Sequence, residues 1–219
     1  AEDCWNHIAV TYHDGNDDLI FWINGVKDTE NLSFTRQLNT AASGQKSLSI
    51  GAFNVNDAGA ANVFKGNICD VRIYKDDLKL PSIEVLASKI NPDITLGAGT
   101  TNLVAHWSLM NGSVADEGAS DKGGSATSHT LTAVSSPAQD YDAFSVNAQD
   151  TVATDGEFTL TQGKLEGLSL SSFDYSGDNF LSIGTAGITS LTKGTISCWV
   201  LADNWTNTDE HYIYSLNDV

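Results

Sequence analysis

Several kinds of residue are scarce in this sequence, and each shortage argues against a class of protein. Three cysteines in 219 residues are an odd number and too few for a disulfide scaffold. Only 11 Lys and Arg residues stand against 28 Asp and Glu residues, and the net charge of −17 opposes binding to nucleic acid or to anionic membranes. No run of about 18 apolar residues occurs, so a membrane-spanning helix is not expected. The balance of 3 prolines and 19 glycines favours an all-β protein with many tight turns.

The abundant residues predict a series of short strands. Hydrophobic residues make up 41% of the chain, which is enough for a real core. Residues 5–12 (WNHIAVTY) and 19–23 (LIFWI) have the composition of strands, and Asn24-Gly25 after them is a strong signal for a hairpin turn. One short helix is expected from Pro81 to Ser88. Further strands are expected at residues 48–53, 67–74, 102–107, 158–160, 167–173, 180–183, 195–201 and 212–216.

Four motifs in the first part of the chain resemble one family. They are WNHIAVTY at 5–12, FWINGV at 21–26, LSIG at 48–51, and FKGNI at 64–68 followed by DVRIY at 70–74. Their order over about 75 residues resembles the closing strands of laminin G-like, concanavalin A-like jelly rolls. The resemblance implies an all-β, two-sheet sandwich, and even the short helix lies where that family places one.

The order of the motifs along the whole chain is unusual for that family. Residues 1–90 resemble the C-terminal half of a laminin G-like jelly roll, 91–101 read as a linker, and 102–219 resemble the N-terminal half. Two interpretations follow. The chain is a circularly permuted jelly roll that closes on itself, or it spans a domain junction and each half is completed by another chain or by sequence not present here.

Acidic loop residues suggest a calcium site, since Ca²⁺ takes six to eight oxygen ligands. The resemblance adds to this expectation, because related jelly rolls often hold one Ca²⁺. However, Cys69 occupies a position where the family's closing strand often has an acidic residue. We therefore expect the ligands in two other loops, with Asp116 and Asp121 in one and Asp174 and Asp178 in the other.

A second candidate site is a polar loop that contains an aromatic residue. Trp205 follows Asp203 and Asn204, and an exposed indole there could stack on a sugar ring. The histidines show no metal-binding spacing, and His7 and His106 are expected to be hydrogen-bonded structural residues beside tryptophans.

Little in the sequence supports catalysis. Relatives of this fold that cleave glycans carry paired carboxylates on one strand, and no E-x-D-x-E run occurs here. A nucleophile elbow, a P-loop and a glycine-rich dinucleotide turn are also absent from the sequence. We expect a protein that is not an enzyme.

The cysteines are expected to be free thiols on apolar strand faces. Strand alternation places Cys69 with Val71 and Ile73, and it places Cys198 with the apolar residues on either side of it. A pairing of Cys69 with Cys198 across neighbouring strands remains an alternative.

These observations predict a non-enzymatic extracellular module that binds glycans or surface proteins, as adhesins do. The alternative is a structural building block of a filament, fibre, surface layer or virion, in which copies complete one another head to tail. Nucleic acid and membrane insertion are not expected. Either role places the protein outside the cell or on a cell or virion surface, where salt screens its acidic surface over about 8–10 Å.

Overall fold

The computed structural model describes the strands and their immediate connections. The described residues are 5–13, 18–28, 32–33, 47–54, 60–61, 64–90, 102–109, 131–134, 138–140, 158–161, 164–165, 172–175, 180–183, 193–202 and 212–217. Every strand pair in these ranges is antiparallel. The architecture is therefore all-β apart from one short helix, as the sequence predicts.

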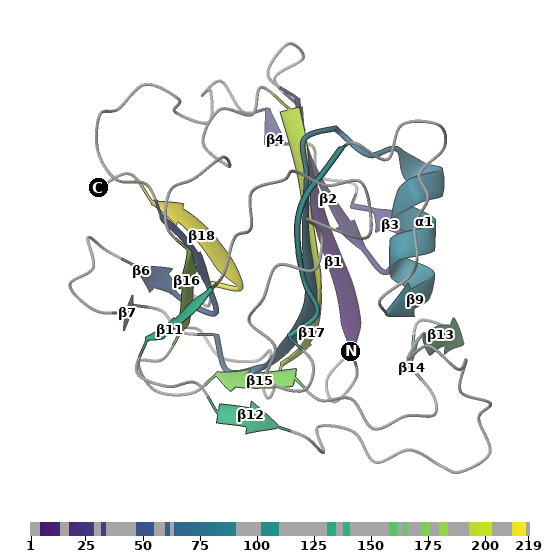
Figure 1. The fold of residues 1–219 in the computed structure, drawn as a ribbon. Coiled ribbons are helices and arrows are strands. Elements are labelled where there is room, and N and C mark those ends of the chain that lie inside the picture. Colours follow the sequence, from purple (N-terminus) through teal and green to yellow (C-terminus); the bar gives the residue numbers. More distant parts are fainter. Residues whose placement is uncertain are drawn as a thin grey trace.

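The largest sheet is the centre of the molecule (Figure 1). Its strand order is β12-β15-β8-β17-β1-β2-β3, with β10 also paired to β8 and β4 also paired to β2. These strands are β1 (Asn6–His13), β2 (Asp18–Ile23), β3 (Val26–Lys27), β4 (Leu32–Ser33), β8 (Gly66–Tyr74), β10 (Leu103–Trp107), β12 (Ala138–Asp140), β15 (Ser172–Tyr175) and β17 (Lys193–Ala202).

Strand β17 joins the two parts of the chain. It pairs with β1 on one side and with β8 on the other, in the registers His7↔Trp199 and Ile73↔Ile196. The strands predicted at residues 5–12 and 195–201 are thus direct neighbours within this one chain.

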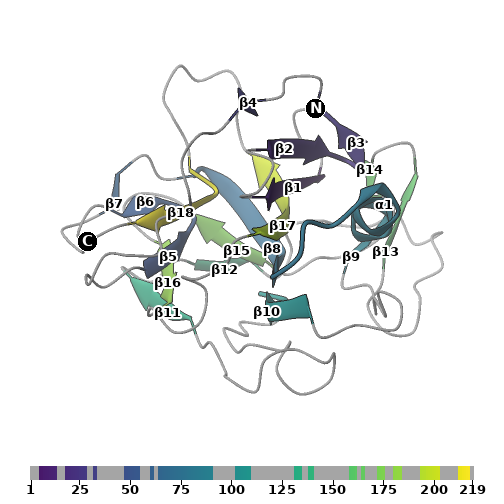
Figure 2. The ribbon, with the colours of Figure 1, turned by 90° about the horizontal axis from the view of Figure 1, so that it is seen from above.

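A smaller sheet covers one face of the large one (Figures 1 and 2). Its order is β11-β16-β5-β18, and its strands are β5 (Ser47–Ile50), β11 (Thr132–Val134), β16 (Phe180–Ile183) and β18 (Tyr214–Asn217). Between the two sheets lies the main core, to which β8 contributes Ile68, Val71 and Ile73 and β17 contributes Cys198 and Val200. This is the two-layer packing expected of a sandwich.

The helix α1 (Leu80–Ser88) lies on the opposite face of the large sheet (Figure 1). Pro81 follows its first residue, where a missing N–H costs nothing. Ile83, Leu86 and Ala87 are the buried side of the helix. Ile83 and Leu86 form a second core with Ala9, Trp22, Tyr74, Leu78 and Leu103.

The remaining strands are short and form separate small sheets. They pair as β14-β13-β9 and β6-β7, with β6 (Phe53–Asn54), β7 (Ala60–Ala61), β9 (Lys89–Ile90), β13 (Phe158–Thr161) and β14 (Lys164–Leu165). No helix among the described residues is long and apolar enough to cross a membrane.

The Asn24-Gly25 turn is confirmed. Both residues have positive φ, 51° and 81°, as the tight hairpin turn requires. The turn joins β2 to β3, in which Ile23 pairs with Val26. The Nδ2 group and the Oδ1 atom of Asn24 also bind Asn6 and the backbone N–H of His7, which ties the turn to β1.

The expected alternation along β8 is wrong at one position. Asp70 has φ 50°, and the register with β17 shifts between Ser197 and Trp199. Asp70 and Val71 together lie opposite Cys198, which is a β-bulge. The bulge reverses the alternation, so Val71 faces the main core with Ile68, and Cys69 is absent from that core. Cys69 thus lies on the other face of the sheet from Val71 and Ile73.

Candidate functional site

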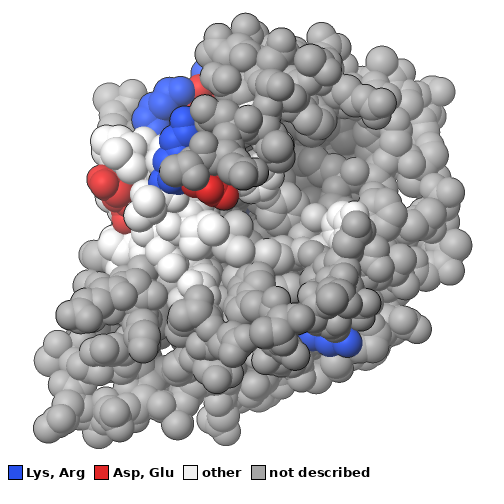
Figure 3. Space-filling model, turned by 180° about the vertical axis from the view of Figure 1, so that it is seen from behind, with Lys and Arg blue, Asp and Glu red and all other residues white. Residues whose placement is uncertain are grey.

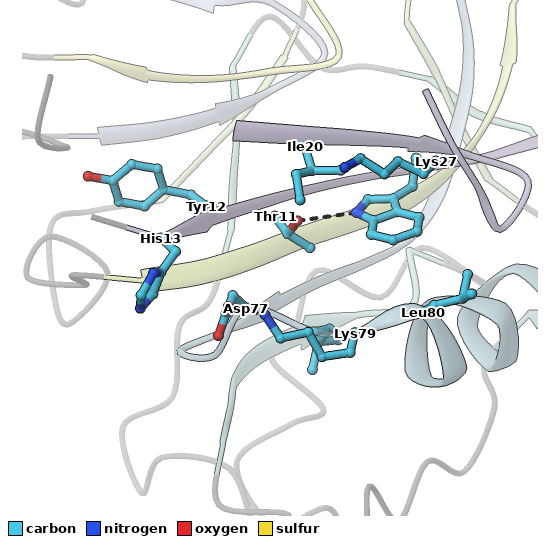
Figure 4. A pocket seen from close by; sticks show the side chains of 10 residues that line it. Thr11, Tyr12, His13, Ile20, Lys27, Asp77, Lys79 and Leu80 are labelled. Atoms are coloured by element: carbon cyan, nitrogen blue, oxygen red, sulfur yellow. Dashed lines mark hydrogen bonds and ion pairs between the residues drawn. The ribbon is translucent and has the colours of Figure 1, made fainter. Parts of the chain in front are cut away.

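A groove opens on the helix side of the large sheet, between the β1–β2 hairpin and the segment that leads into α1. Its volume is about 170 Å³. The lining residues are Thr11, Tyr12, His13, Ile20, Trp22, Lys27, Asp77, Leu78, Lys79 and Leu80. Figure 4 shows Thr11, Ile20 and Lys27 on one side and Asp77, Lys79 and Leu80 on the other.

The sheet register aligns the first wall of the groove. Thr11 on β1 pairs with Ile20 on β2, and Trp22 on β2 pairs with Lys27 on β3. The indole N–H of Trp22 donates to Oγ1 of Thr11 over 3.2 Å. Trp22 is therefore fixed, with 6% of its surface exposed.

The second wall is held in place by β17. The backbone N–H of Leu78 donates to Oγ1 of Thr195 over 2.9 Å, and that hydroxyl donates to the carbonyl of Asp76 over 2.7 Å. Thr195 is buried, and it fixes the segment that positions Asp77 and Lys79. Both walls thus depend on strands that are far apart in the sequence.

The groove is lined by charged side chains of both signs, Lys27, Asp77 and Lys79. Figure 3 shows basic and acidic side chains close together on the face that it draws. The ammonium group of Lys79 binds the carboxylate of Asp77, and that of Lys193 binds Asp76 and lies 3.7 Å from Asp77. Partial burial raises the pKa of Asp77, but hydrogen bonding and charge from Lys79 outweigh it and the net pKa is lowered. The hydrogen bond and charge of Asp76 raise the pKa of Lys193. The groove is therefore polar and locally slightly basic, since Lys27 and Lys79 line it with the single carboxylate of Asp77, in a protein that is strongly acidic as a whole.

A second polar cluster lies buried within the large sheet. Oδ1 of Asp70 accepts from Nε of Arg72 at 3.0 Å and lies 2.7 Å from Nε2 of His106. All three side chains are at most 2% exposed. Burial lowers the pKa of Arg72, but the charge of Asp70 outweighs it and the net pKa is raised. The cluster joins β8 to β10, where no ligand can reach it.

No sequence pattern indicated this cluster, although a hydrogen-bonded structural role was predicted for His106. That role is confirmed by Asp70. For His7 the prediction is only half right. His7 is buried beside Trp199, but neither of its ring nitrogens has a hydrogen-bond partner among the residues that the structure describes.

Most of the site residues expected from the sequence lie outside the described residues. These are Trp205, Asp203 and Asn204 of the ligand loop, and Asp116, Asp121 and Asp178 of the calcium loops. Asp174 does not lie in a loop. Its backbone belongs to β15 and pairs with Asn67 of β8 and Ala138 of β12, because the strand continues past Phe173. Among the described residues, no three His, Cys, Asp or Glu side chains are grouped closely enough to hold a metal ion.

The two cysteines that the structure describes are free thiols. Cys69 and Cys198 are buried, and Cys69 pairs in register with Trp199 rather than with Cys198. Burial raises the pKa of both thiols, since the thiolate would lose its solvation. Cys4 lies outside the described residues.

Comparison with known families identifies the first part of the chain. The family model described as the concanavalin A-like lectin/glucanases superfamily, of the laminin G type, matches residues 1–84. Residues 1–84, the laminin G-like segment, are thus the part of the chain that is similar to this family. No curated protein and no solved structure matches the chain.

The laminin G-like segment includes β1, β2 and β8 and ends within α1. It therefore contains every residue that lines the groove. The family that it matches is described as one of lectins and glucanases. Strand β17, which lies between β1 and β8, comes from residues beyond the match.

Proposed function

We propose that the protein is a non-enzymatic, extracellular lectin-like module that binds an uncharged glycan, free or carried by a surface protein, in the groove between β1, β2 and residues 77–80. The observation that supports this most directly is the composition of the groove. Apolar and aromatic side chains alternate there with hydrogen-bonding groups, all within the laminin G-like segment.

Sugar rings have apolar C–H faces and a rim of hydroxyl groups. Ile20, Trp22 and Leu80 supply apolar surface, of which Leu80 is 45% exposed. Lys27 and Lys79 can donate hydrogen bonds to sugar oxygens, while the carboxylate of Asp77 can accept them from hydroxyls. A few placed polar groups among apolar walls are typical of small-molecule sites.

The ion pairs beside the groove and the acidic charge of the whole chain favour an uncharged sugar over a sulfated or carboxylated one. Lys79 and Lys193 are already paired with Asp77 and Asp76. An anionic sugar would have to compete with these carboxylates and overcome the net charge of −17. A neutral polyhydroxyl ligand would neither compete with these carboxylates nor be repelled by the net negative charge.

The test is a glycan array with neutral and anionic members, followed by affinity measurements on groove variants. Asp77→Ala and Lys27→Ala should weaken binding of the best neutral ligand several-fold, because each removes a hydrogen-bonding group from the groove. Lys65→Ala is the matched control, since Lys65 is exposed and does not line the groove. Binding that survives both groove variants, or selects only anionic glycans, would overturn the proposal.

The loop with Trp205 provides a competing location for the same activity. Trp205→Ala should leave affinity unchanged if the groove is the site. Loss of binding in this variant, with normal binding by Asp77→Ala, would place the glycan at residues 203–205 instead. Repeating the array with a chelator tests whether calcium takes part.

We also propose, as a second candidate, a structural role in which copies exchange strands. The support is the place of β17, since β1 and β8 of the laminin G-like segment pair with a strand from residues 193–202 and not with each other. If β17 of one copy enters the sheet of the next, the contact is heterologous and extends head to tail.

Cysteines placed where β1 pairs with β17 in the full-length chain distinguish a sheet closed within one copy from strand exchange between copies. His13 pairs with Lys193, and both side chains are partly exposed. After oxidation at high protein concentration, the double variant His13→Cys, Lys193→Cys should give a covalent ladder on a denaturing gel if copies exchange β17. A cross-linked monomer would exclude exchange. Each single variant is the control for reactions with native cysteines.

A further inference from the structure

His7 occupies the seam between β1 and β17. Its register partner is Trp199, and the two rings meet edge to face, with 5.4 Å between centroids and 61° between planes. The backbone of His7 is fixed on the other side by Asn24, whose Oδ1 accepts from the His7 N–H and whose N–H donates to the His7 carbonyl, each over 2.8 Å. The imidazole is 1% exposed, so it cannot reach water while β1 and β17 remain paired.

A protonated imidazole would be poorly accommodated in this position. In the described part of the chain neither ring nitrogen of His7 has a hydrogen-bond partner, and an imidazolium needs acceptors for two N–H groups. The uncharged Trp199 and Ser197 of β17 are in the facing strand. Burying an unpaired charge in this way is strongly unfavourable.

The charged and titratable groups near His7 do not remove this cost. Asp70 and Arg72 of β8 act on His7 through their charges. Cys69 of β8 pairs with Trp199, and His106 of β10 contacts Asp70. The carboxylate of Asp70 already accepts from Arg72 and contacts His106. Burial lowers the pKa of His7 to about 3; Asp70 raises it and Arg72 lowers it by smaller amounts.

We propose that His7 makes the pairing of β1 with β17 sensitive to acid. Mild acid favours separation of the two strands, because the imidazole can take up a proton only after they separate. Strand β1 also carries Thr11, Tyr12 and His13 of the groove. Opening of the seam therefore removes one wall of the groove.

The direction of the effect follows from proton linkage. The pKa of an exposed histidine is about 6.5, so the open chain gains a proton below that pH and the closed chain does not. The contribution of the uncharged His7 to stability is fully present above about pH 6.5. It is lost as the pH falls toward the folded-state pKa of about 3. The equilibrium constant for opening rises up to about tenfold per pH unit, which amounts to about 25-fold between pH 7 and pH 5.

The test compares denaturant unfolding of the full chain at pH 7 and pH 5. His7→Phe keeps an aromatic ring against Trp199 and removes the proton acceptor, so its unfolding constant should change about 25-fold less than that of the wild type. His13→Gln, on the same strand but half-buried, is the matched control and should retain the wild-type pH dependence. A wild-type pH dependence in His7→Phe would overturn the proposal.

If His7→Phe does not fold, the wild-type protein supplies an independent readout. The imidazole C–H resonance of His7 in the folded protein should not shift between pH 7 and pH 5, while the folded signals lose intensity. A His7 resonance that titrates within the intact fold would show that the closed seam accepts the proton, and would overturn the proposal.

Discussion

Asp70 and His106 are joined by a 2.7 Å contact between Oδ1 and Nε2, with both side chains buried. They lie on β8 and β10, at the bulge where β8 changes its neighbour from β15 to β10. The backbone N–H of Asp70 also donates to the carbonyl of Ser108 over 2.9 Å. This one residue therefore ties the strand from residues 103–107 to the laminin G-like segment.

Asp70→Asn should destabilise the fold by about 3 kcal/mol or more, because it leaves the buried guanidinium of Arg72 without its carboxylate. Urea unfolding at pH 7 measures the change. Asp77→Asn is the control, since its partner Lys79 is 76% exposed, and we expect it to cost about 1 kcal/mol or less. Equal losses in the two variants would contradict a structural role for the buried cluster.

Thr195→Val should loosen the segment before α1. It removes a hydroxyl that accepts from the Leu78 N–H and donates to the Asp76 carbonyl, and it leaves both backbone groups without that partner. We expect a loss of about 1–3 kcal/mol. Thr195→Ser, which keeps the hydroxyl, should recover most of it, and an unchanged unfolding midpoint in Thr195→Val would count against this anchor.

Gly66→Ala should be among the most damaging small substitutions. Gly66 has φ 140°, and a Cβ there would lie 2.0 Å from the carbonyl oxygen of Leu201 on β17. Backbone strain alone costs about 1–3 kcal/mol, and the overlap forces β8 and β17 apart. Circular dichroism during heating should show a large loss of stability, whereas Lys65→Ala next to it should change stability by no more than about 0.5 kcal/mol.

The thiols of Cys69 and Cys198 should not react in the native protein. Both are buried, and burial raises their pKa values, so little thiolate forms and reagents have no access. Thiol counting should find these two groups only after denaturation, and with Cys4 it should give three free thiols without reductant. One thiol under those conditions would reveal a disulfide.

Calcium binding at Asp116, Asp121, Asp174 or Asp178 remains a prediction from the sequence. Ca²⁺ that binds only the folded state raises its stability by about 2.7 kcal/mol at a hundredfold excess over Kd. Thermal unfolding in millimolar Ca²⁺ and in EDTA measures this directly. Equal melting temperatures would exclude a stabilising site.

Much of the fold could be predicted from local patterns. The strands around residues 6–13, 66–74 and 193–202, the Asn24-Gly25 turn and the helix behind Pro81 all follow from alternation, positive φ and the tolerance of proline at a helix start. The groove could not be predicted in this way. Its walls come from residues 11–27 and 77–80. They are held together by the pairing of β1 with β17, by the anchor at Thr195 and by the second core, in which Trp22 and Leu78 lie.

The sequence by itself determined that the chain forms antiparallel strands with apolar faces, because strand periodicity and turn chemistry depend on neighbouring residues. The tertiary structure decided where those faces point. The bulge at Asp70 turned Cys69 away from the main core, and the pairing of β1 with β17 buried the His7 ring with no hydrogen-bond partner among the described residues. Both outcomes depend on strands more than 100 residues away, whose register and charges no local pattern contains.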